Sequence, residues 1–289
     1  FGSSYVASRS LLSPSLSIYL SGCRLRSCPT CQTPRWSMPS DDSGNHGSST
    51  EDVVASVTSA VRARRSTRAF LRDKPVPLEL IEDILDTARR APSGGNCQPW
   101  HLYVTAGAAR DALVAAFKQP GALPSAAPAE YKVYPPNDVA PPTYAARRRK
   151  VAYGMWELMG VDRKDTAART TAALRNFDFF GAPVGIIVTV DRACDRNGWG
   201  HVGMLLQTIC LLAQERGLAT CMQEAWGNLG SVVYRALDIP STEVIWCGLA
   251  LGYADPSQRV NTLRTEREPL KAFVRFSGFP PAGATASKL

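Results

Sequence analysis

The longest apolar stretch of the chain, residues 202–213, places the strongest constraint on its fold. It contains Gln207 and Thr208, and it is shorter than the roughly 18 uncharged apolar residues that a membrane helix needs. The pattern predicts instead a helix over residues 203–216 that ends at Gly217, a residue suited to a helix C-cap. A helix this apolar has to be covered by other elements. We therefore expect a globular fold around a central buried helix, with no membrane partner.

Further helical and strand patterns alternate loosely along the chain. Pro77 suits a helix start, and Leu78, Ile81, Leu85 and Ala88 would form one apolar face of the helix that follows it. Such alternation is typical of an α/β or α+β sandwich. Predicted strands cover residues 101–105, 184–190 and 244–251, a last one could lie over 270–276, and predicted helices cover residues 110–117, 144–158 and 166–177.

The first 50 residues differ in composition from the rest. They are rich in Ser, Pro and Arg, and the first acidic residue is Asp41. This head resembles an organelle transit peptide, or it is sequence upstream of a start at Met38, which we favour slightly. Either way we expect residues 1–50 to be disordered, because they cannot bury enough apolar surface. A single domain is expected over residues 51–280, followed by a flexible tail over 281–289, in a protein that is cytoplasmic unless the head targets it to an organelle.

The charge and the cysteines suggest two other kinds of partner. The net charge of +8 suits nucleic acid or a phosphorylated ligand, but no zinc-finger, helix-turn-helix or RNA-binding signature accompanies it. Cys28 and Cys31 have C-x-x-C spacing, yet a tetrahedral zinc site needs four ligands, and Cys23 and His46 complete the set only at irregular spacing. We therefore expect neither nucleic-acid binding nor a bound metal.

Two basic segments could hold an anion. The first follows a predicted helix and reads Arg64-Arg65-Ser66-Thr67-Arg68-Ala69-Phe70. Its guanidinium groups match phosphate oxygens two at a time, and its hydroxyls add further donors. The second segment follows the last predicted strand and reads Asn261-Thr262-Leu263-Arg264-Thr265-Glu266-Arg267. Each segment alone is equally typical of a solvated surface.

A glycine-rich turn joins a predicted helix to the first predicted strand and reads Ala91-Pro92-Ser93-Gly94-Gly95-Asn96-Cys97-Gln98-Pro99-Trp100. Such a turn exposes backbone N–H groups, and glycine allows a planar ligand to approach the main chain closely. The amides of Asn96 and Gln98 could bind the polar edge of a ring. Alone, this segment is an ordinary helix-to-strand turn.

Together and in this order, the three segments resemble the nitroreductase family of FMN enzymes, over about residues 56–280. Three further stretches resemble its nitrobenzoate- and nitrobenzamide-reducing branch: Tyr-Ala-Ala-Arg-Arg-Arg at 144–149, the stretch 176–184, and the end 261–270. The resemblance implies an α+β fold, a three-layer α/β/α sandwich with a central mixed sheet. It also implies a homodimer with C-terminal strand exchange and FMN sites at the subunit interface.

The resemblance assigns roles to individual residues. Arg64, Ser66 and Arg68 would hold the FMN phosphate and ribityl chain, with a lesser role for Arg65. The turn would reach the flavin bound by the partner subunit through Pro92, Ser93, Gly94 and Asn96. The segment Gln223-Glu224-Ala225 would place a backbone N–H against flavin N5, although family members often have Glu-Gly there. One or both of Arg264 and Arg267 would contact phosphate. We further expect an acceptor pocket shaped by the aromatic residues Tyr144, Tyr153, Trp156, Phe179 and Phe180.

The implied reaction is carried by the cofactor. NAD(P)H would deliver hydride to flavin N5 and leave, and a nitroaromatic or quinone-like acceptor would then take two electrons in a ping-pong cycle. No catalytic side chain is needed, and His101 and His201 suit structural positions. Gly198, Gly200 and Gly203 fit G-x-G-x-x-G, but the polar stretch before them argues against a Rossmann turn. Alternatives are a flavin or quinone reductase, a non-catalytic FMN-binding protein of the same fold, and, remotely, a basic nucleic-acid-binding protein.

Overall fold

The computed structural model describes residues 56–118, 130–131, 134–135, 139–194 and 196–279. The expected disordered head over 1–50 and the expected tail over 281–289 lie outside these residues. The described residues contain seven α-helices: α1 Val57–Ala63, α2 Leu78–Ala88, α3 Gly107–Phe117, α4 Pro142–Met159, α5 Thr166–Leu174, α6 Arg196–Glu215 and α7 Gly230–Ala236. They also contain four strands: β1 Trp100–Ala106, β2 Val184–Asp191, β3 Ala219–Gln223 and β4 Glu243–Gly252.

The four strands form one sheet in the order β1-β2-β4-β3, and every neighbouring pair is antiparallel. The expectation of a mixed sheet was therefore wrong for the described part of this chain, since a mixed sheet needs a parallel strand pair. The parallel pairing present there is an isolated bridge between Ser66 and Thr220, next to which the Thr67 N–H donates to the Thr220 carbonyl at 3.0 Å. This bridge attaches the basic segment to the edge strand β3.

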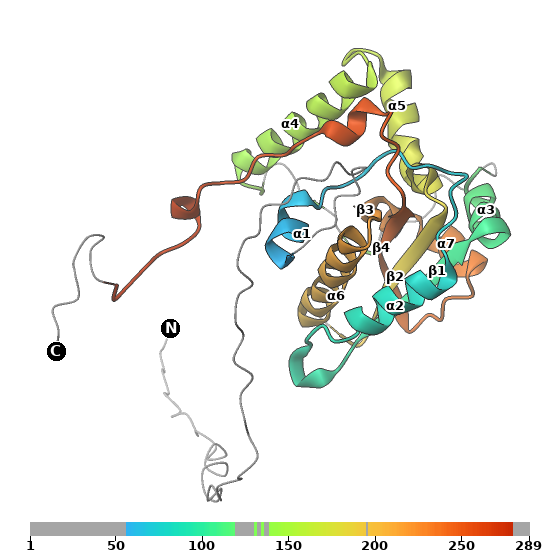
Figure 1. Ribbon diagram of the computed structural model, residues 1–289, viewed down its shortest axis with the longest axis horizontal. Helices are drawn as coiled ribbons and strands as arrows, with labels where there is room; N and C mark the ends of the chain where they lie inside the picture. The colour runs from blue at the N-terminus through green and yellow to red at the C-terminus, as the bar shows by residue number, and fades with distance from the viewer. Residues whose placement is uncertain (1–55, 119–129, 132–133, 136–138, 195, 280–289) are drawn as a thin grey trace, which may run out of the picture. The chain divides into compact units, whose positions relative to one another are not determined.

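One face of the sheet is covered by α2 and α6 (Figure 1). The predicted burial of the apolar helix is confirmed, because Val202, Leu206, Ile209 and Ala213 are fully buried against the sheet. The helix begins at Arg196, earlier than predicted, so the glycines of the G-x-G-x-x-G pattern lie inside α6 rather than in a turn. A Rossmann fold needs these glycines in the turn between a strand and a helix, where they form a phosphate-binding loop. Glycines within a helix form no such loop, so the pattern is not a Rossmann motif in this chain.

The other face carries α3 and α7 over a second core built around Phe179 and Trp226. These two rings stack with their centroids 4.5 Å apart. They fit because the neighbouring strands β2 and β4 present Gly185 and Gly248, where a Cβ atom would lie 2.4 Å from Phe179 and 2.3 Å from Trp226. With a core on each face of the sheet, the expected three-layer arrangement is confirmed.

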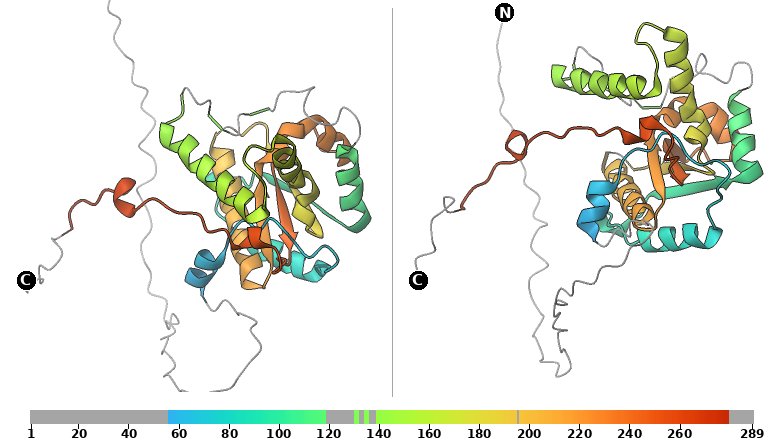
Figure 2. Two further views of the ribbon diagram at one scale, coloured as in Figure 1. Left: turned by 90° about the horizontal axis from the view of Figure 1, so that it is seen from above. Right: turned by 45° about the horizontal axis from the view of Figure 1, so that its top comes forward.

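The last described segment, after the 3-10 turn Arg259–Thr262, leaves the sandwich (Figure 2). Leu270–Ala272 forms a single 3-10 turn, so the strand expected over 270–276 is not formed by the described chain. Among the described residues, no strand pairs with this segment, and a lone strand has no hydrogen-bond partner. Phe273, Phe276 and Phe279 stay 67, 69 and 74% exposed. Among the described residues, no helix has the length and apolarity needed to cross a membrane.

Candidate functional site

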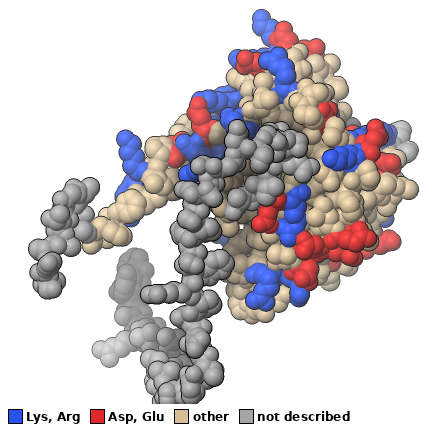
Figure 3. All heavy atoms as spheres, in the orientation of Figure 1, with Lys and Arg blue, Asp and Glu red and all other residues tan. Residues whose placement is uncertain are grey.

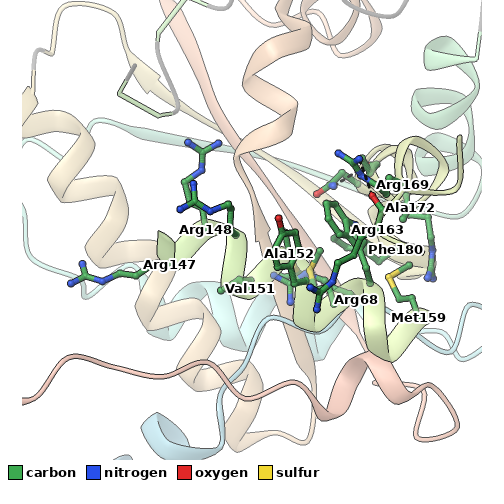
Figure 4. A pocket seen from close by; sticks show the side chains of 18 of the residues that line it. Arg68, Arg147, Arg148, Val151, Ala152, Met159, Arg163, Arg169, Ala172 and Phe180 are labelled. Atoms are coloured by element: carbon green, nitrogen blue, oxygen red, sulfur yellow. Dashed lines mark hydrogen bonds between the residues drawn. The ribbon is translucent and has the colours of Figure 1, made fainter. Parts of the chain in front are cut away.

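A cavity of about 920 Å³ opens between α4, α5 and the end of β3 (Figure 4). One end is formed by Arg68 together with Cys221 and Met222 of β3. Helix α4 forms a wall; it starts with Pro142 in its first turn and ends at Gly160, whose φ of 68° lets the chain turn out of the helix. The volume is in the range of ligand pockets.

Three of the five aromatic residues expected in the acceptor pocket line this cavity: Tyr153, Trp156 and Phe180. Tyr144 is placed outside the lining, 47% exposed, with the Arg147 guanidinium 5.9 Å from its ring. Phe179 belongs to the core instead, with no exposed surface, because Gly185 of β2 leaves space for its ring. Tyr144 and Phe179 were expected in the acceptor pocket, but neither of them lines the cavity in this chain.

A strained turn separates Phe179 from Phe180. The 3-10 segment Arg175–Gly181 contains both residues at positive φ, 48° and 53°, in a region that bulky side chains seldom adopt. The turn is anchored by Asp178, whose carboxylate pairs with Arg72 and with the buried Arg110 on α3. The anchored turn directs one ring into the core and the next into the cavity.

The basic segment and the C-terminal loop come together beside the cavity. The Arg68 N–H donates to Asn261 Oδ1 at 2.9 Å, and the Asn261 amide donates to the Ala69 carbonyl at 2.8 Å. Burial lowers the pKa of Arg65, and the nearby charge of Arg264 lowers it further. Arg267, in contrast, donates to Thr265 Oγ1 at 2.7 Å. Two guanidinium groups held close together without a carboxylate between them favour an anion.

The thiols behind the basic segment are unsuited to nucleophilic chemistry. Burial raises the pKa of Cys221 to about 11, although Arg68, Arg64 and the Ser66 hydroxyl act in the opposite direction. Burial also raises the pKa of Cys210, which lies close enough to Arg64 to feel its charge. Both side chains are therefore neutral at physiological pH and act as packing groups. The sequence analysis missed Cys221 and Met222 as cavity residues, because strand β3 is too short to show a pattern.

The segment Gln223-Glu224-Ala225 lies at the end of β3 and begins a 3-10 helix, Glu224–Leu229. Gln223 is 2% exposed; its amide donates to the Asn176 carbonyl at 2.7 Å, while its Oε1 has no partner among the described residues. Desolvation raises the pKa of Glu224. The segment is thus held rigidly at the boundary between the sheet and the cavity, with one buried acceptor left free.

The glycine-rich turn of residues 91–100 lies away from the cavity in this chain. Its Gly94 N–H donates to His201 Nε2 at 3.0 Å, near the start of α6, and Ser93 Oγ accepts from the Gln98 N–H at 3.0 Å. Gly95 and Asn96 adopt positive φ, 59° and 57°. Arg64 of the basic segment lies near Cys210 of α6. His201, which binds Gly94, is on the same helix, but Cys210 lies roughly 13 Å further along the helix axis at 1.5 Å per residue. None of Pro92, Ser93, Gly94 and Asn96 lines the cavity.

Comparison with known proteins identifies the family. Residues 61–253 match the Nitroreductase family, and this chain belongs to it. The chain is 40% identical over 219 residues to a 4-nitrobenzoate reductase of Pseudomonas putida, covering 76% of this chain and 94% of that protein. It is 37% identical over 217 residues to a nitrobenzene nitroreductase of Ectopseudomonas oleovorans, covering 75% and 94%. The crystal structure of the FMN- and NADPH-dependent nitroreductase NfnB from Sphigopyxis sp. strain HMH superposes with a TM-score of 0.73 at 34% identity, covering 78% of this chain and all of that one.

Proposed function

We propose that this protein is an FMN-dependent oxidoreductase that takes hydride from NAD(P)H and reduces nitroaromatic or quinone-like acceptors in a ping-pong cycle. The observation that carries the proposal is the attachment of the basic segment to the C-terminal loop beside a large cavity lined by Arg68: the Arg68 N–H donates to Asn261 Oδ1 at 2.9 Å, and burial and the charge of Arg264 lower the pKa of Arg65. The named relatives act on nitroaromatic compounds, and the NfnB structure is described as FMN- and NADPH-dependent.

The residues present fit FMN. Arg65 and Arg264 repel each other unless an anion lies between them, which suits the phosphate, with Arg64 and Ser66 beside them. The buried Gln223 Oε1 lacks a donor that a flavin ring N–H or an ordered water could supply. The chain's own role would be to hold the ring, with the backbone N–H groups of Glu224 and Ala225 as candidate donors to it. When bound, FMN accepts hydride and passes two electrons to the acceptor.

We also propose a homodimer with shared flavin sites. Within one chain the Pro92–Asn96 turn lies far from the basic segment, and a second subunit would bring a copy of it to the flavin. The exposed phenylalanines of the last described segment also support exchange of C-terminal segments between subunits. We further propose a cytoplasmic protein with one catalytic domain over residues 51–280.

The surface charge supports a small anionic ligand rather than a nucleic acid. In Figure 3, acidic side chains gather over α2, which carries Glu79, Glu82, Asp83 and Asp86. On the face that Figure 3 shows, acidic side chains therefore interrupt the basic surface. A nucleic-acid interface would need a continuous basic surface along an exposed face.

The test is the visible spectrum of the purified protein, followed by anaerobic addition of NADH or NADPH. The expected result is a flavin spectrum that bleaches, and that recovers when a nitroaromatic or quinone is added. A bound flavin that does not bleach would favour a non-catalytic flavin-binding protein. A colourless protein that takes up no added FMN would contradict the proposal.

A further inference from the structure

The cavity carries a concentration of positive charge that binding an uncharged acceptor does not require. Among the described residues, its lining contains no Asp or Glu, but it contains seven arginines: Arg68, Arg147, Arg148, Arg149, Arg163, Arg169 and Arg175. Ligand pockets are usually lined mainly by apolar groups with a few polar ones. Arg68, Arg169 and Arg175 are half-buried, and the other four are exposed to solvent. Like charges that surround one space repel one another, and a negative group that enters it relieves this repulsion.

These arginines lack the partners that other arginines of the chain have. Arg72, Arg89, Arg110, Arg192 and Arg216 each pair with a carboxylate. Among the cavity arginines, within the described part of the chain, ion pairing is confined to Arg147, whose Nη2 lies 2.7 Å from Glu268 Oε1. Arg147 also extends away from the group formed by Arg68, Arg163 and Phe180 (Figure 4). The six other arginines remain unpaired among the described residues; of these, Arg163 and Arg169 lie in the loop before α5 and on α5.

Two of these arginines lie against aromatic rings of the opposite wall. The Arg163 guanidinium is 4.3 Å from the Tyr153 ring centroid, and that of Arg169 is 4.6 Å from the Trp156 ring. Arg169 Nη1 donates to the backbone carbonyl of Arg163 at 3.2 Å, which holds the Arg169 side chain against the loop that carries Arg163. Arg169 Nε is buried and has no partner among the described residues. A guanidinium fixed in this way has donors left for a planar, two-oxygen acceptor.

We infer that Arg163 and Arg169 form a carboxylate site, and that the enzyme prefers aromatic acceptors that carry an acid group opposite the group to be reduced. This inference rests on the proposed function. The acceptor ring would lie between the aromatic wall and Phe180. Its carboxylate would bind Arg163 and Arg169, and its reducible group would point to the end of the cavity at Arg68 and Met222. The named relatives include reductases of both charged and uncharged nitroaromatics, so membership of the family leaves this preference open.

The test compares 4-nitrobenzoate with its uncharged methyl ester as acceptors for the FMN-loaded enzyme. We expect a higher kcat/KM for the acid, and we expect Arg169→Gln and Arg163→Gln to lower the acid-to-ester ratio roughly 10- to 100-fold, mainly through KM. The matched control is Arg147→Gln on the same wall, where the ratio should stay within about twofold because Glu268 already neutralises that charge. Calorimetric titration with benzoate and benzamide gives a readout without turnover: only benzoate binding should weaken in the two variants.

Each other outcome has a separate meaning. An active enzyme with equal kcat/KM for acid and ester would overturn the carboxylate site and leave the proposed function intact. The same holds if the two variants change the preference for NADPH over NADH but not the acid-to-ester ratio, because the arginines would then serve the dinucleotide phosphate. Failure to bind FMN or to oxidise NAD(P)H with either acceptor would instead contradict the proposed function.

Discussion

Helices α6 and α4 are the two longest of the described chain, with 20 and 18 residues, and they are held by different forces. Helix α6 has seven buried residues, whereas α4 has none. Helix α4 contacts the C-terminal segment through two exposed ion pairs, Arg147 with Glu268 and Lys150 with Glu266 at 2.6 Å, and it contacts Arg163 and Arg169 through Tyr153 and Trp156. The scaffold is thus fixed by apolar burial, and the cavity wall by weaker contacts that ligands or a second subunit can change.

The largest effect should follow from a substitution that leaves a void in the apolar core around α6. Ile209 of α6 has no exposed surface, and Ile209→Ala should lower the free energy of unfolding by about 2–5 kcal/mol. Urea unfolding followed by circular dichroism measures this change. The control is Met204→Ala on the same helix, 40% exposed, where a change within about 0.5 kcal/mol is expected. Equal effects of the two substitutions would mean that α6 is not the core element described above.

The next largest effect should follow from breaking the ion pair that connects α3 to the turn beside the cavity. Arg110 is 3% exposed, and its Nη2 lies 2.7 Å from Asp178 Oδ1, at the base of the strained turn of Phe179 and Phe180. Arg110→Met leaves that carboxylate without its buried partner and should cost about 1–3 kcal/mol of stability. Because the turn orients Phe180, KM for the acceptor should rise more than kcat falls. Arg72→Met, which removes the exposed partner of Asp178, should have a smaller effect on both; the reverse order would contradict the anchoring role of Arg110.

The same carboxylate predicts a pH dependence. Desolvation alone would raise the pKa of Asp178, but its hydrogen bond to Arg72 and the charge of Arg110 outweigh it, and the pKa is lowered. A carboxyl whose pKa is lowered by folding stabilises the native state above its unfolded pKa of about 3.9, and this contribution is lost as pH falls through the lower folded value. Melting temperatures measured from pH 5 to pH 3 should therefore fall less steeply in Asp178→Asn than in the unmodified protein. Parallel curves would show that Asp178 does not titrate differently in the folded state.

The same contrast explains which parts of the structure the sequence predicts. The start of α2 after Pro77 was predicted correctly, and the bounds of β2 and β4 to within about a residue, because apolar burial imposes a regular pattern on these segments. Strand β3 and helix α7 were missed, because five and seven residues are too few to show a period. In the site, sequence reasoning could not separate Phe179 from Phe180. Their different positions depend on positive φ angles and on glycines of two distant strands. The roles of Arg163 and Arg169 depend on tertiary contacts, which no local motif encodes.

The smallest effect should come from the attachment of α4. Glu268→Gln removes one exposed ion pair, so the free energy of unfolding should change by less than about 1 kcal/mol. Local opening of the wall should respond more clearly than global unfolding, because few apolar contacts hold α4 in place. Hydrogen exchange of the α4 amides should quicken by up to roughly fivefold, while exchange in α6 stays unchanged. Asp86→Asn, which breaks the exposed pair with Arg89 next to α2, is the matched control and should leave α4 unaffected. A global loss well above 1 kcal/mol in Glu268→Gln would place α4 within the cooperative core and remove the distinction between scaffold and wall.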